Sequence, residues 1–247
     1  MLTTMVYDQI ISKYKRGEKQ LAILLDPDKL PNKSLTQLSQ VLQKVTPDII
    51  LVGGSLVSTD TFDFINNLKK VIDQPIILYP GSSSQYASNA DALLYISLLS
   101  GRNPEFLISH HVASAPLIKA NDTEAISTGY LLIDGGRITS VQYVSQTLPI
   151  PADKSDIAVA TALAGQYLGM KLIYMDAGSG AINPIPKKMI EDVKNQIDIP
   201  LMIGGGLNSK EKIASACQAG ADIIVVGNAL EKDVSLLKEF YQSVKAH

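Results

Sequence analysis

The chain has few of the features that mark disulfide-rich, metal-binding or membrane-spanning proteins. Cys217 is its only cysteine, which excludes an internal disulfide and a cysteine-based zinc site. No apolar run approaches the roughly 20 residues that span a bilayer, and the polar, amphipathic residues 1–20 are unlike a signal peptide. The formal net charge of −2 gives no electrostatic case for nucleic-acid binding. We therefore expect a soluble, cytoplasmic protein with no nucleic-acid partner and no transmembrane segment.

Short β-rich runs recur along the chain, and most of them are continuously apolar rather than alternating. Continuous apolar runs are typical of strands that are buried on both faces of a parallel sheet. The predicted strands are residues 21–25, 48–52, 75–79, 92–96, 129–133, 171–175, 200–204 and 222–227.

Helical patterns separate several of these strands. They cover residues 33–45, 59–72, 104–120, 154–169 and 209–220. Thr59 or Thr61 could cap the second helix, Ser209 begins the last one, and Gly169 and Gly220 are stop signals. The adjacent His110 and His111 do not share a helix face and lack a partner four residues away, so we expect a surface or packing role for them.

Eight buried strands with intervening helices in about 250 residues favour a (β/α)₈ TIM barrel of parallel strands, with an open doubly wound sheet as the alternative. Two regions depart from a regular barrel. Residues 79–92 leave little room for a helix, so the helix after the third strand is missing or replaced by a loop. Residues 129–151 read as a β-hairpin that turns at the sequence DGGR. Because no linker divides the chain, we expect a single domain over residues 1–247.

Glycine-rich turns follow the last strands, at the end of a barrel where active sites lie. The triplet Gly204–Gly206 exposes backbone amides, and Gly227 and Asn228 precede a short helix. Loops after strands seven and eight together with a short helix form the usual phosphate site of such barrels. The triplet alone could be a flexible turn, but the two turns together predict phosphate binding, to which Gly178–Gly180 could add donors.

Acidic side chains stand at two other strand ends. Asp26 ends the first strand, where a carboxylate without a partner is costly, and Mg²⁺ is a cation that takes carboxylate, hydroxyl and phosphate oxygens. Ser55, at the next strand end, could add a hydroxyl. For Asp28 a turn or capping role is at least as plausible. Asp176 lies beside the predicted phosphate site and is better suited to accept hydrogen bonds or a proton from substrate hydroxyls; Tyr174 points to the same side of its strand.

The motifs LLDPDK, LVGGS, ILYPGS, YMDAGSG, IGGGL and VVGNAL, in this order, resemble those of geranylgeranylglyceryl phosphate synthase and of its bacterial relatives, the polyprenylglyceryl phosphate synthases. The resemblance runs from the first predicted strand to the last. It implies a modified TIM barrel with a helix missing near strand three. It also implies the activity of the family, which joins the C3 hydroxyl of sn-glycerol 1-phosphate to a prenyl diphosphate with Mg²⁺, giving an ether-linked prenylglyceryl phosphate and diphosphate; we expect geranylgeranyl diphosphate.

The same resemblance implies roles for individual residues. Asp26 and Ser55 would hold Mg²⁺, and Asp26 and Asp176 would be catalytic. Glycerol phosphate would contact Tyr174, Met175, Asp176, Ala177, Gly178, Ser179 and Gly180. Its phosphate would be held by Gly205, Gly206, Gly227 and Asn228. The family commonly has glutamate where this chain has Asp176, which keeps the charge but is one methylene shorter.

The resemblance also implies an apolar groove for the prenyl tail, with Tyr79, Leu93, Tyr95 and the helix from residue 104 as candidates. Relatives form dimers or hexamers, so we expect a homo-oligomer, and the lipid product could bring transient membrane contact.

Two other functions remain open. A phosphate-binding isomerase or lyase could act on a small phosphosugar with Asp26 and Asp176 as acid and base, and a non-catalytic sensor could bind a phosphate ligand without turnover.

Overall fold

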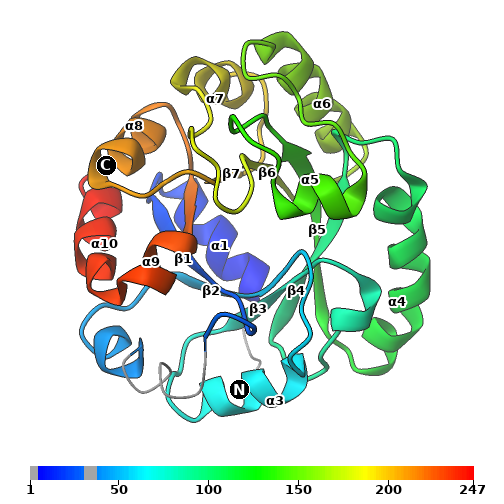
Figure 1. Ribbon diagram of the computed structural model, residues 1–247, viewed down its shortest axis with the longest axis vertical. Coiled ribbons are helices and arrows are strands. Elements are labelled where there is room, and N and C mark those ends of the chain that lie inside the picture. Colours follow the sequence, from blue (N-terminus) through cyan, green and yellow to red (C-terminus); the bar gives the residue numbers. More distant parts are fainter. Residues whose placement is uncertain (1–4, 31–37) are drawn as a thin grey trace.

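The chain folds into a closed barrel of parallel strands, each paired with the next along the sequence and the last with the first (Figure 1). The computed structural model describes residues 5–30 and 38–247. The strands are β1 Gln20–Leu25, β2 Ile49–Gly54, β3 Ile76–Pro80, β4 Ala92–Leu98, β5 Glu124–Leu132, β6 Leu172–Asp176, β7 Leu201–Gly204 and β8 Ile223–Val226. The predicted parallel (β/α)₈ barrel is confirmed, and an open doubly wound sheet is excluded.

Most of the helices surround the barrel on its outer side, and α1 lies across one end of it (Figure 1). The longer ones are α1 Val6–Lys15, α3 Thr61–Lys69, α4 His110–Ala120, α6 Ser155–Tyr167, α7 Lys187–Lys194, α8 Lys210–Gln218 and α10 Leu237–Lys245. Shorter segments are η1 Ser83–Gln85, the π-helical η2 Glu105–Ser109, α5 Ser140–Ser145, α9 Asn228–Lys232 and η3 Val234–Leu236. Of the first predicted helix, residues 38–42 are helical and residues 33–37 lie outside the described residues. No helix within the described residues is long and apolar enough to cross a bilayer.

Strand side chains alternate between two apolar cores. Leu51, Leu94 and Tyr174 belong to a cluster inside the barrel. Ile50 and Ile173, their neighbours along the strands, belong to a cluster that includes helix residues outside it. Because both faces of each strand are buried, the strands have the continuous apolar runs from which they were predicted.

Helix α1 closes the barrel at the amino-terminal ends of the strands. Its Val6 and Ile10 join the interior cluster. Glu124, the first residue of β5, accepts hydrogen bonds from the backbone amides of Val6 at 2.6 Å and Tyr7 at 2.9 Å. Figure 1 shows α1 behind the ring of strands. The carboxyl ends of the strands are therefore the end at which a ligand can enter.

The structure confirms one predicted irregularity and corrects another. Between β3 and β4 the chain forms only the single turn η1, so the missing helix is confirmed. The predicted hairpin over residues 129–151 is wrong. After β5 the chain continues into α5, and Ile150 then pairs with Ile133 in parallel. A hairpin partner has no place beside β5, because β4 and β6 already occupy its two edges.

The helix boundaries also include one correction. Asp60 caps α3 by accepting a hydrogen bond from the Asp63 amide at 2.9 Å, so the predicted cap at Thr59 or Thr61 is wrong. An aspartate carboxylate caps a helix better than a threonine hydroxyl one residue away. Ser209 caps α8 as predicted, and Gly169 and Gly220 have positive φ angles of 85° and 107° just beyond helix ends.

At the closed end of the barrel, Asp48 ties both chain-terminal helices to the strands. Its carboxylate accepts hydrogen bonds from the Leu21 amide at 2.9 Å and from Lys13 of α1 and Lys245 of α10. Burial raises the pKa of this carboxyl, but the bonds from Lys13, Leu21 and Lys245 outweigh it and lower the pKa overall. The ionised form is therefore favoured by folding.

We expect Asp48→Asn to lower the free energy of unfolding by about 2 kcal/mol at neutral pH, because charged hydrogen bonds are lost at a buried site. Urea denaturation measures this. A lowered folded-state pKa gives stability above the unfolded pKa that is lost as pH falls, so the difference from the parent shrinks below about pH 4. Asp192→Asn, which removes an exposed pair with Lys188, is the control and should change little. Equal effects of the two variants would contradict the role of Asp48.

Candidate active site

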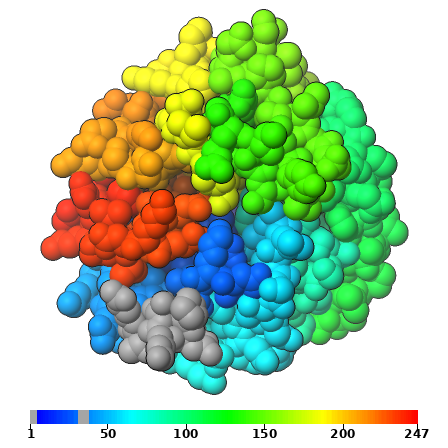
Figure 2. Space-filling model, viewed as in Figure 1, coloured from blue at the N-terminus to red at the C-terminus, as the bar shows by residue number. Residues whose placement is uncertain are grey.

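A cavity of about 620 Å³ opens at the carboxyl ends of the strands. In the space-filling view it is the hollow near the centre of the face (Figure 2). The predicted site residues that line it are Asp26, Ser55, Tyr174, Asp176, Gly178, Ser179, Gly180, Gly205, Gly206, Gly227 and Asn228. The glycine turns and both aspartates therefore meet at one mouth of the barrel, while their roles toward a ligand stay predictions.

Met175 and Ala177 do not line this cavity. Met175 is fully buried in the cluster outside the barrel, because it alternates on β6 with the inward-facing Tyr174 and Asp176. Ala177 is also buried, and its amide donates to the Gly204 carbonyl at 3.1 Å. The structure therefore does not place these two among the residues that reach a ligand in the cavity.

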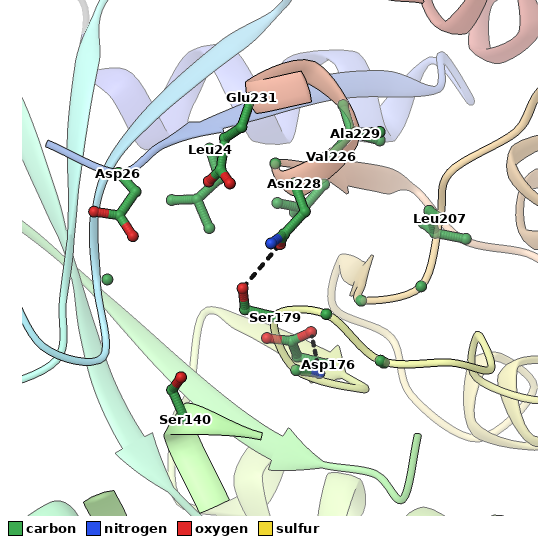
Figure 3. Close-up of a pocket in the computed structure, with 18 of the residues that line it drawn as sticks. Leu24, Asp26, Ser140, Asp176, Ser179, Leu207, Val226, Asn228, Ala229 and Glu231 are labelled. Atoms are coloured by element: carbon green, nitrogen blue, oxygen red, sulfur yellow. Dashed lines mark hydrogen bonds between the residues drawn. The ribbon is translucent and has the colours of Figure 1, made fainter. Parts of the chain in front are cut away.

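The glycine turns approach one another so closely that side chains would not fit. Gly205 has a φ angle of 79°, and a Cβ there would lie 2.6 Å from the Ala177 nitrogen and from Asp176 Oδ1. The loops after β6 and β8 are linked across the cavity, because Ser179 Oγ donates to Asn228 Oδ1 at 2.8 Å (Figure 3). The result is a cradle whose inner surface is mostly backbone, as an anion such as phosphate requires.

Asp26 faces this cradle from the loop after β1. Its Oδ1 accepts a hydrogen bond from the Asp28 amide at 3.1 Å, and its Oδ2 is 2.9 Å from the Lys29 ammonium. Lys29 also approaches Glu231 of α9 at 3.5 Å. Sequence reasoning missed Glu231, although its place in the helix directly after Gly227 and Asn228 was a usable signal.

Asp28 points elsewhere. Its carboxylate accepts hydrogen bonds from the Ser58 amide and hydroxyl, both at 2.9 Å, and from the Thr59 amide at 2.8 Å. Bonds from Thr59 and Ser58 lower the pKa of the Asp28 carboxyl. Asp28 thus holds the loop after β2 against the loop after β1, whereas the local turn in DPDK is formed by Asp26, which accepts the bond from the Asp28 amide.

The oxygen donors at this side of the cavity suit a hard cation. Among residues 5–30 and 38–247, no cluster of three His, Cys, Asp or Glu side chains could hold a metal ion. Asp26 and Ser55 line the same cavity wall and offer a carboxylate and a hydroxyl. Mg²⁺ commonly takes one or two carboxylates and completes its shell with substrate phosphates and water. The oxygen donors present therefore fit Mg²⁺ that arrives with a phosphorylated substrate, while the Lys29 ammonium contacts Asp26 Oδ2 in this structure.

Asp176 lies deep in the cavity and is held by a tyrosine. Its Oδ2 accepts a hydrogen bond from the Tyr130 hydroxyl at 2.7 Å, and its Oδ1 accepts one from the Gly178 amide at 2.8 Å. The Tyr174 ring packs edge-on against Tyr130, with ring centroids 5.2 Å apart. Burial raises the pKa of the Asp176 carboxyl, and the bonds from Tyr130, Gly178 and Tyr79 oppose that shift only in part.

Sequence reasoning missed Tyr130. It lies directly opposite Tyr174 in the β5–β6 register, so it faces the barrel interior as Tyr174 does. A tyrosine within a predicted strand was the available signal, but the strand was predicted to begin at residue 129, so the place of Tyr130 near the carboxyl end of β5 was not apparent. The strand pairing that brings it to Asp176, 46 positions away, was not readable from sequence spacing.

An apolar cleft leads away from the central cavity between β3 and α4, where the helix after β3 is missing. Tyr79 and Tyr130 line both the central cavity and the first part of the cleft. Phe106 and Ile96 line that first part and a second part beneath α4. The proposed groove residues Leu93 and Tyr95 line the second part. The polar cavity and the apolar cleft therefore lie side by side and share the walls formed by Tyr79 and Tyr130.

The two adjacent histidines flank this cleft. Both His110 and His111 line its second part. His111 is buried, with Nε2 3.0 Å from the Ser97 hydroxyl, and its ring packs edge-on against Tyr95. The packing role is confirmed for His111. Burial lowers the pKa of its imidazole, with a further contribution from His110, which favours the neutral ring in an apolar wall.

Sequence comparison identifies the family. The profile of the PcrB family matches residues 14–246. The chain belongs to the PcrB family. A PcrB-family relative from Chitinophaga pinensis, named geranylgeranylglyceryl phosphate synthase, is 50% identical over 242 residues, which are 98% of this chain and 96% of the relative. A protein of the same name from Thermococcus gammatolerans is 40% identical over 233 residues, covering 94% and 92% of the two chains.

Solved structures agree with this family assignment. The (S)-3-O-geranylgeranylglyceryl phosphate synthase of Thermoplasma acidophilum, solved with sn-glycerol-1-phosphate, superposes with a TM-score of 0.92 at 31% identity, covering 99% of this PcrB-family chain and 100% of the other. The N-acetylmannosamine-6-phosphate 2-epimerase of Clostridium perfringens reaches a TM-score of 0.59 at 13% identity and shares the fold alone.

Proposed function

We propose that this PcrB-family chain transfers a prenyl group from a prenyl diphosphate to the C3 hydroxyl of sn-glycerol 1-phosphate. The observation that carries the proposal is that a glycine-lined polar cavity and an apolar cleft lie side by side and share Tyr79 and Tyr130 in their walls. A small phosphorylated alcohol suits the first space, and a long hydrocarbon tail suits the second. The names of the relatives and the substrate in the Thermoplasma structure support the same pair of substrates.

The chemistry at the boundary of the two spaces follows from Asp176. Its carboxylate has acceptor capacity beyond the bonds from Tyr130 and Gly178, and it can accept a hydrogen bond from the glycerol C3 hydroxyl. The hydroxyl oxygen forms a bond to C1 of the prenyl chain while the bond from C1 to the diphosphate oxygen breaks and its electron pair leaves with diphosphate. The hydroxyl proton passes to Asp176 or to the departing diphosphate.

Divalent metal is the implied cofactor. We propose that Asp26 and Ser55 hold Mg²⁺, which when bound would neutralise negative charge on the diphosphate. The carboxylate that this chain offers to the metal is that of Asp26, whose side chain is only 14% exposed and lines the cavity opposite the cradle. The cradle formed by Gly205, Gly206 and the Ser179–Asn228 pair would hold the glycerol phosphate.

The decisive experiment incubates the protein with sn-glycerol 1-phosphate, Mg²⁺ and prenyl diphosphates of several lengths, and analyses the lipid product by mass. For each prenyl diphosphate that the protein accepts, we expect one ether-linked prenylglyceryl phosphate as the product. We expect geranylgeranyl diphosphate to be among the best substrates. Chelation of Mg²⁺ should abolish product formation. Binding of glycerol phosphate without release of diphosphate would favour a sensor instead.

A phosphosugar isomerase or lyase is the competing enzyme class. It would use the same cradle, with Asp26 and Asp176 as acid and base. The apolar cleft argues against it, because a small phosphosugar would leave that cleft without a function.

We further propose that the protein works in the cytoplasm as a homo-oligomer, a dimer or hexamer, with transient membrane contact for its product. The exposed Ile108, Val112 and Leu117 on η2 and α4 would suit contact with a second copy, which light scattering would detect.

We expect Gly205→Val to weaken sn-glycerol 1-phosphate binding by at least about 100-fold and prenyl diphosphate binding far less. The new Cβ would collide with the Ala177 and Asp176 atoms that shape the cradle, whereas the apolar cleft is lined by other residues. Calorimetric titration with each substrate measures the two affinities; 100-fold corresponds to about 2.8 kcal/mol.

Gly17→Val is the matched control for this variant. Gly17 has a similar φ angle of 72°, but a Cβ there would meet nothing within 4 Å. It should share the backbone strain of about 1–3 kcal/mol without losing affinity for either substrate. Equal loss of both affinities in Gly205→Val would show that the phosphate site is placed wrongly.

A further inference from the structure

Lys29 forms a bridge between two carboxylates at the edge of the cavity. Its ammonium is 2.9 Å from Asp26 Oδ2 and 3.5 Å from Glu231 Oε1. The Asp26 and Glu231 side chains are only 14% and 15% exposed, whereas Lys29 is 44% exposed. Figure 3 shows Asp26 and Glu231 along the upper edge of the cavity, with Asp176 below them. The lysine therefore supplies positive charge to two carboxylates that have little access to water.

This arrangement conflicts with metal binding at Asp26 as it stands. A divalent cation on the Asp26 carboxylate would lie within a few ångströms of the Lys29 ammonium, and like charges at that distance repel strongly where water is scarce. The Asp28 amide donates to the other oxygen, Oδ1, so the lysine and the metal would share a single carboxylate whose Oδ2 the lysine already contacts. One of the two cations has to move.

Glu231 offers the lysine a second place. Because Lys29 already contacts Glu231 from a half-exposed, flexible side chain, it can leave Asp26 and keep one ion pair. The pKa of the Glu231 carboxyl is raised by burial, and Lys29 opposes that shift. A lysine that moved fully to Glu231 would still line the cavity that receives the diphosphate.

We propose that Lys29 competes with the divalent cation for Asp26 and is displaced toward Glu231 when the cation binds. The inference rests on the proposed metal-dependent function and adds to it a residue that sets the metal affinity. The lysine keeps the site neutralised before substrates arrive, so that the metal binds well only together with the diphosphate that it accompanies.

The test measures binding of Mn²⁺, a paramagnetic substitute for Mg²⁺, by electron paramagnetic resonance of the free ion, without substrates. We expect Lys29→Met to bind Mn²⁺ about tenfold more tightly than the parent protein, because the competing charge is gone. Lys29→Arg keeps a competing charge and should bind like the parent. Lys188→Met, which removes an exposed lysine paired with Asp192 on α7, is the control and should also bind like the parent.

Unchanged or weaker Mn²⁺ binding in Lys29→Met would overturn the proposal. It would show that the Lys29–Asp26 ion pair only anchors the loop and does not compete with the metal for Asp26. Asp26→Asn in the same assay separates the causes of failure. If that variant binds Mn²⁺ like the parent, the metal does not use Asp26 and the competition does not exist. Product formation in the lipid assay is measured independently, so a failed transferase assignment would leave the Mn²⁺ result standing.

Discussion

Asp26→Asn is expected to lower the rate of prenyl transfer by about 10³-fold while sn-glycerol 1-phosphate binding survives. The substitution removes the negative charge that would hold Mg²⁺ beside the diphosphate, and such metal contacts contribute several kcal/mol to charge stabilisation. The loop should keep its shape, because an asparagine oxygen can still accept the hydrogen bond from the Asp28 amide. The glycine turns of the cradle follow other strands and should keep their affinity.

Single-turnover product formation and calorimetric titration with sn-glycerol 1-phosphate measure the two halves of this prediction. Asp28→Asn is the control, since its carboxylate bonds Ser58 and Thr59 and does not line the cavity. It should cost stability in the loop with less than about tenfold loss of rate. Normal turnover in Asp26→Asn would exclude Asp26 as the metal ligand.

The positions of most strands could be predicted from the sequence, because strands that are buried on both faces are continuously apolar. The runs around Leu51, Ile77 and Ile203 are apolar throughout, and the structure places their neighbours alternately inside and outside the ring. The strand-end rule then located the mouth, because every strand of a closed parallel barrel finishes at the same end.

The region after β5 was misread because its local signals conflict with its surroundings. Asp134 accepts a hydrogen bond from the amide of Gly136, which has a φ angle of 83°, so the predicted turn exists. It does not reverse a strand, because a closed barrel offers no free edge on which a returning strand could pair. The first five residues of β5 were also missed, because the strand begins with the charged Glu124. The carboxylate of Glu124 fits there because it accepts hydrogen bonds from the backbone amides at the start of α1.

The partners of the site residues were also beyond the sequence. Asp26 was found because a carboxylate at the end of a buried strand is costly without a partner, and Asp176 was found because it lies beside the predicted phosphate site. Lys29 and Glu231 meet only because β1 and β8 are neighbours, although their positions in the chain lie 202 apart. Contacts of this kind depend on strand register and loop path, for which the amino-acid pattern carries no local signal.

We expect Asp176→Asn to lower the rate of prenyl transfer by about 10² to 10⁴-fold, the usual contribution of a positioned base. An asparagine oxygen can keep the bond from the Gly178 amide, but it cannot take a proton from the glycerol hydroxyl. Asp176→Glu is the matched control, because it keeps the carboxylate and adds only one methylene. It should stay within about tenfold of the parent, even though Gly205 packs closely against the shorter side chain.

The pH dependence of the rate distinguishes a proton-accepting or ionised Asp176 from a merely structural one. Burial raises the pKa of its carboxyl, and the groups that face it are Tyr79, Tyr130 and Tyr174. Activity that needs the ionised form is present above this raised pKa and is lost as pH falls through it. Tyr130→Phe removes a donor that favours the ionised form, so its acidic limb should move to higher pH. A limb that stays in place in Tyr130→Phe, or that persists unchanged in Asp176→Asn, would assign the titration to another group and leave Asp176 with a structural role.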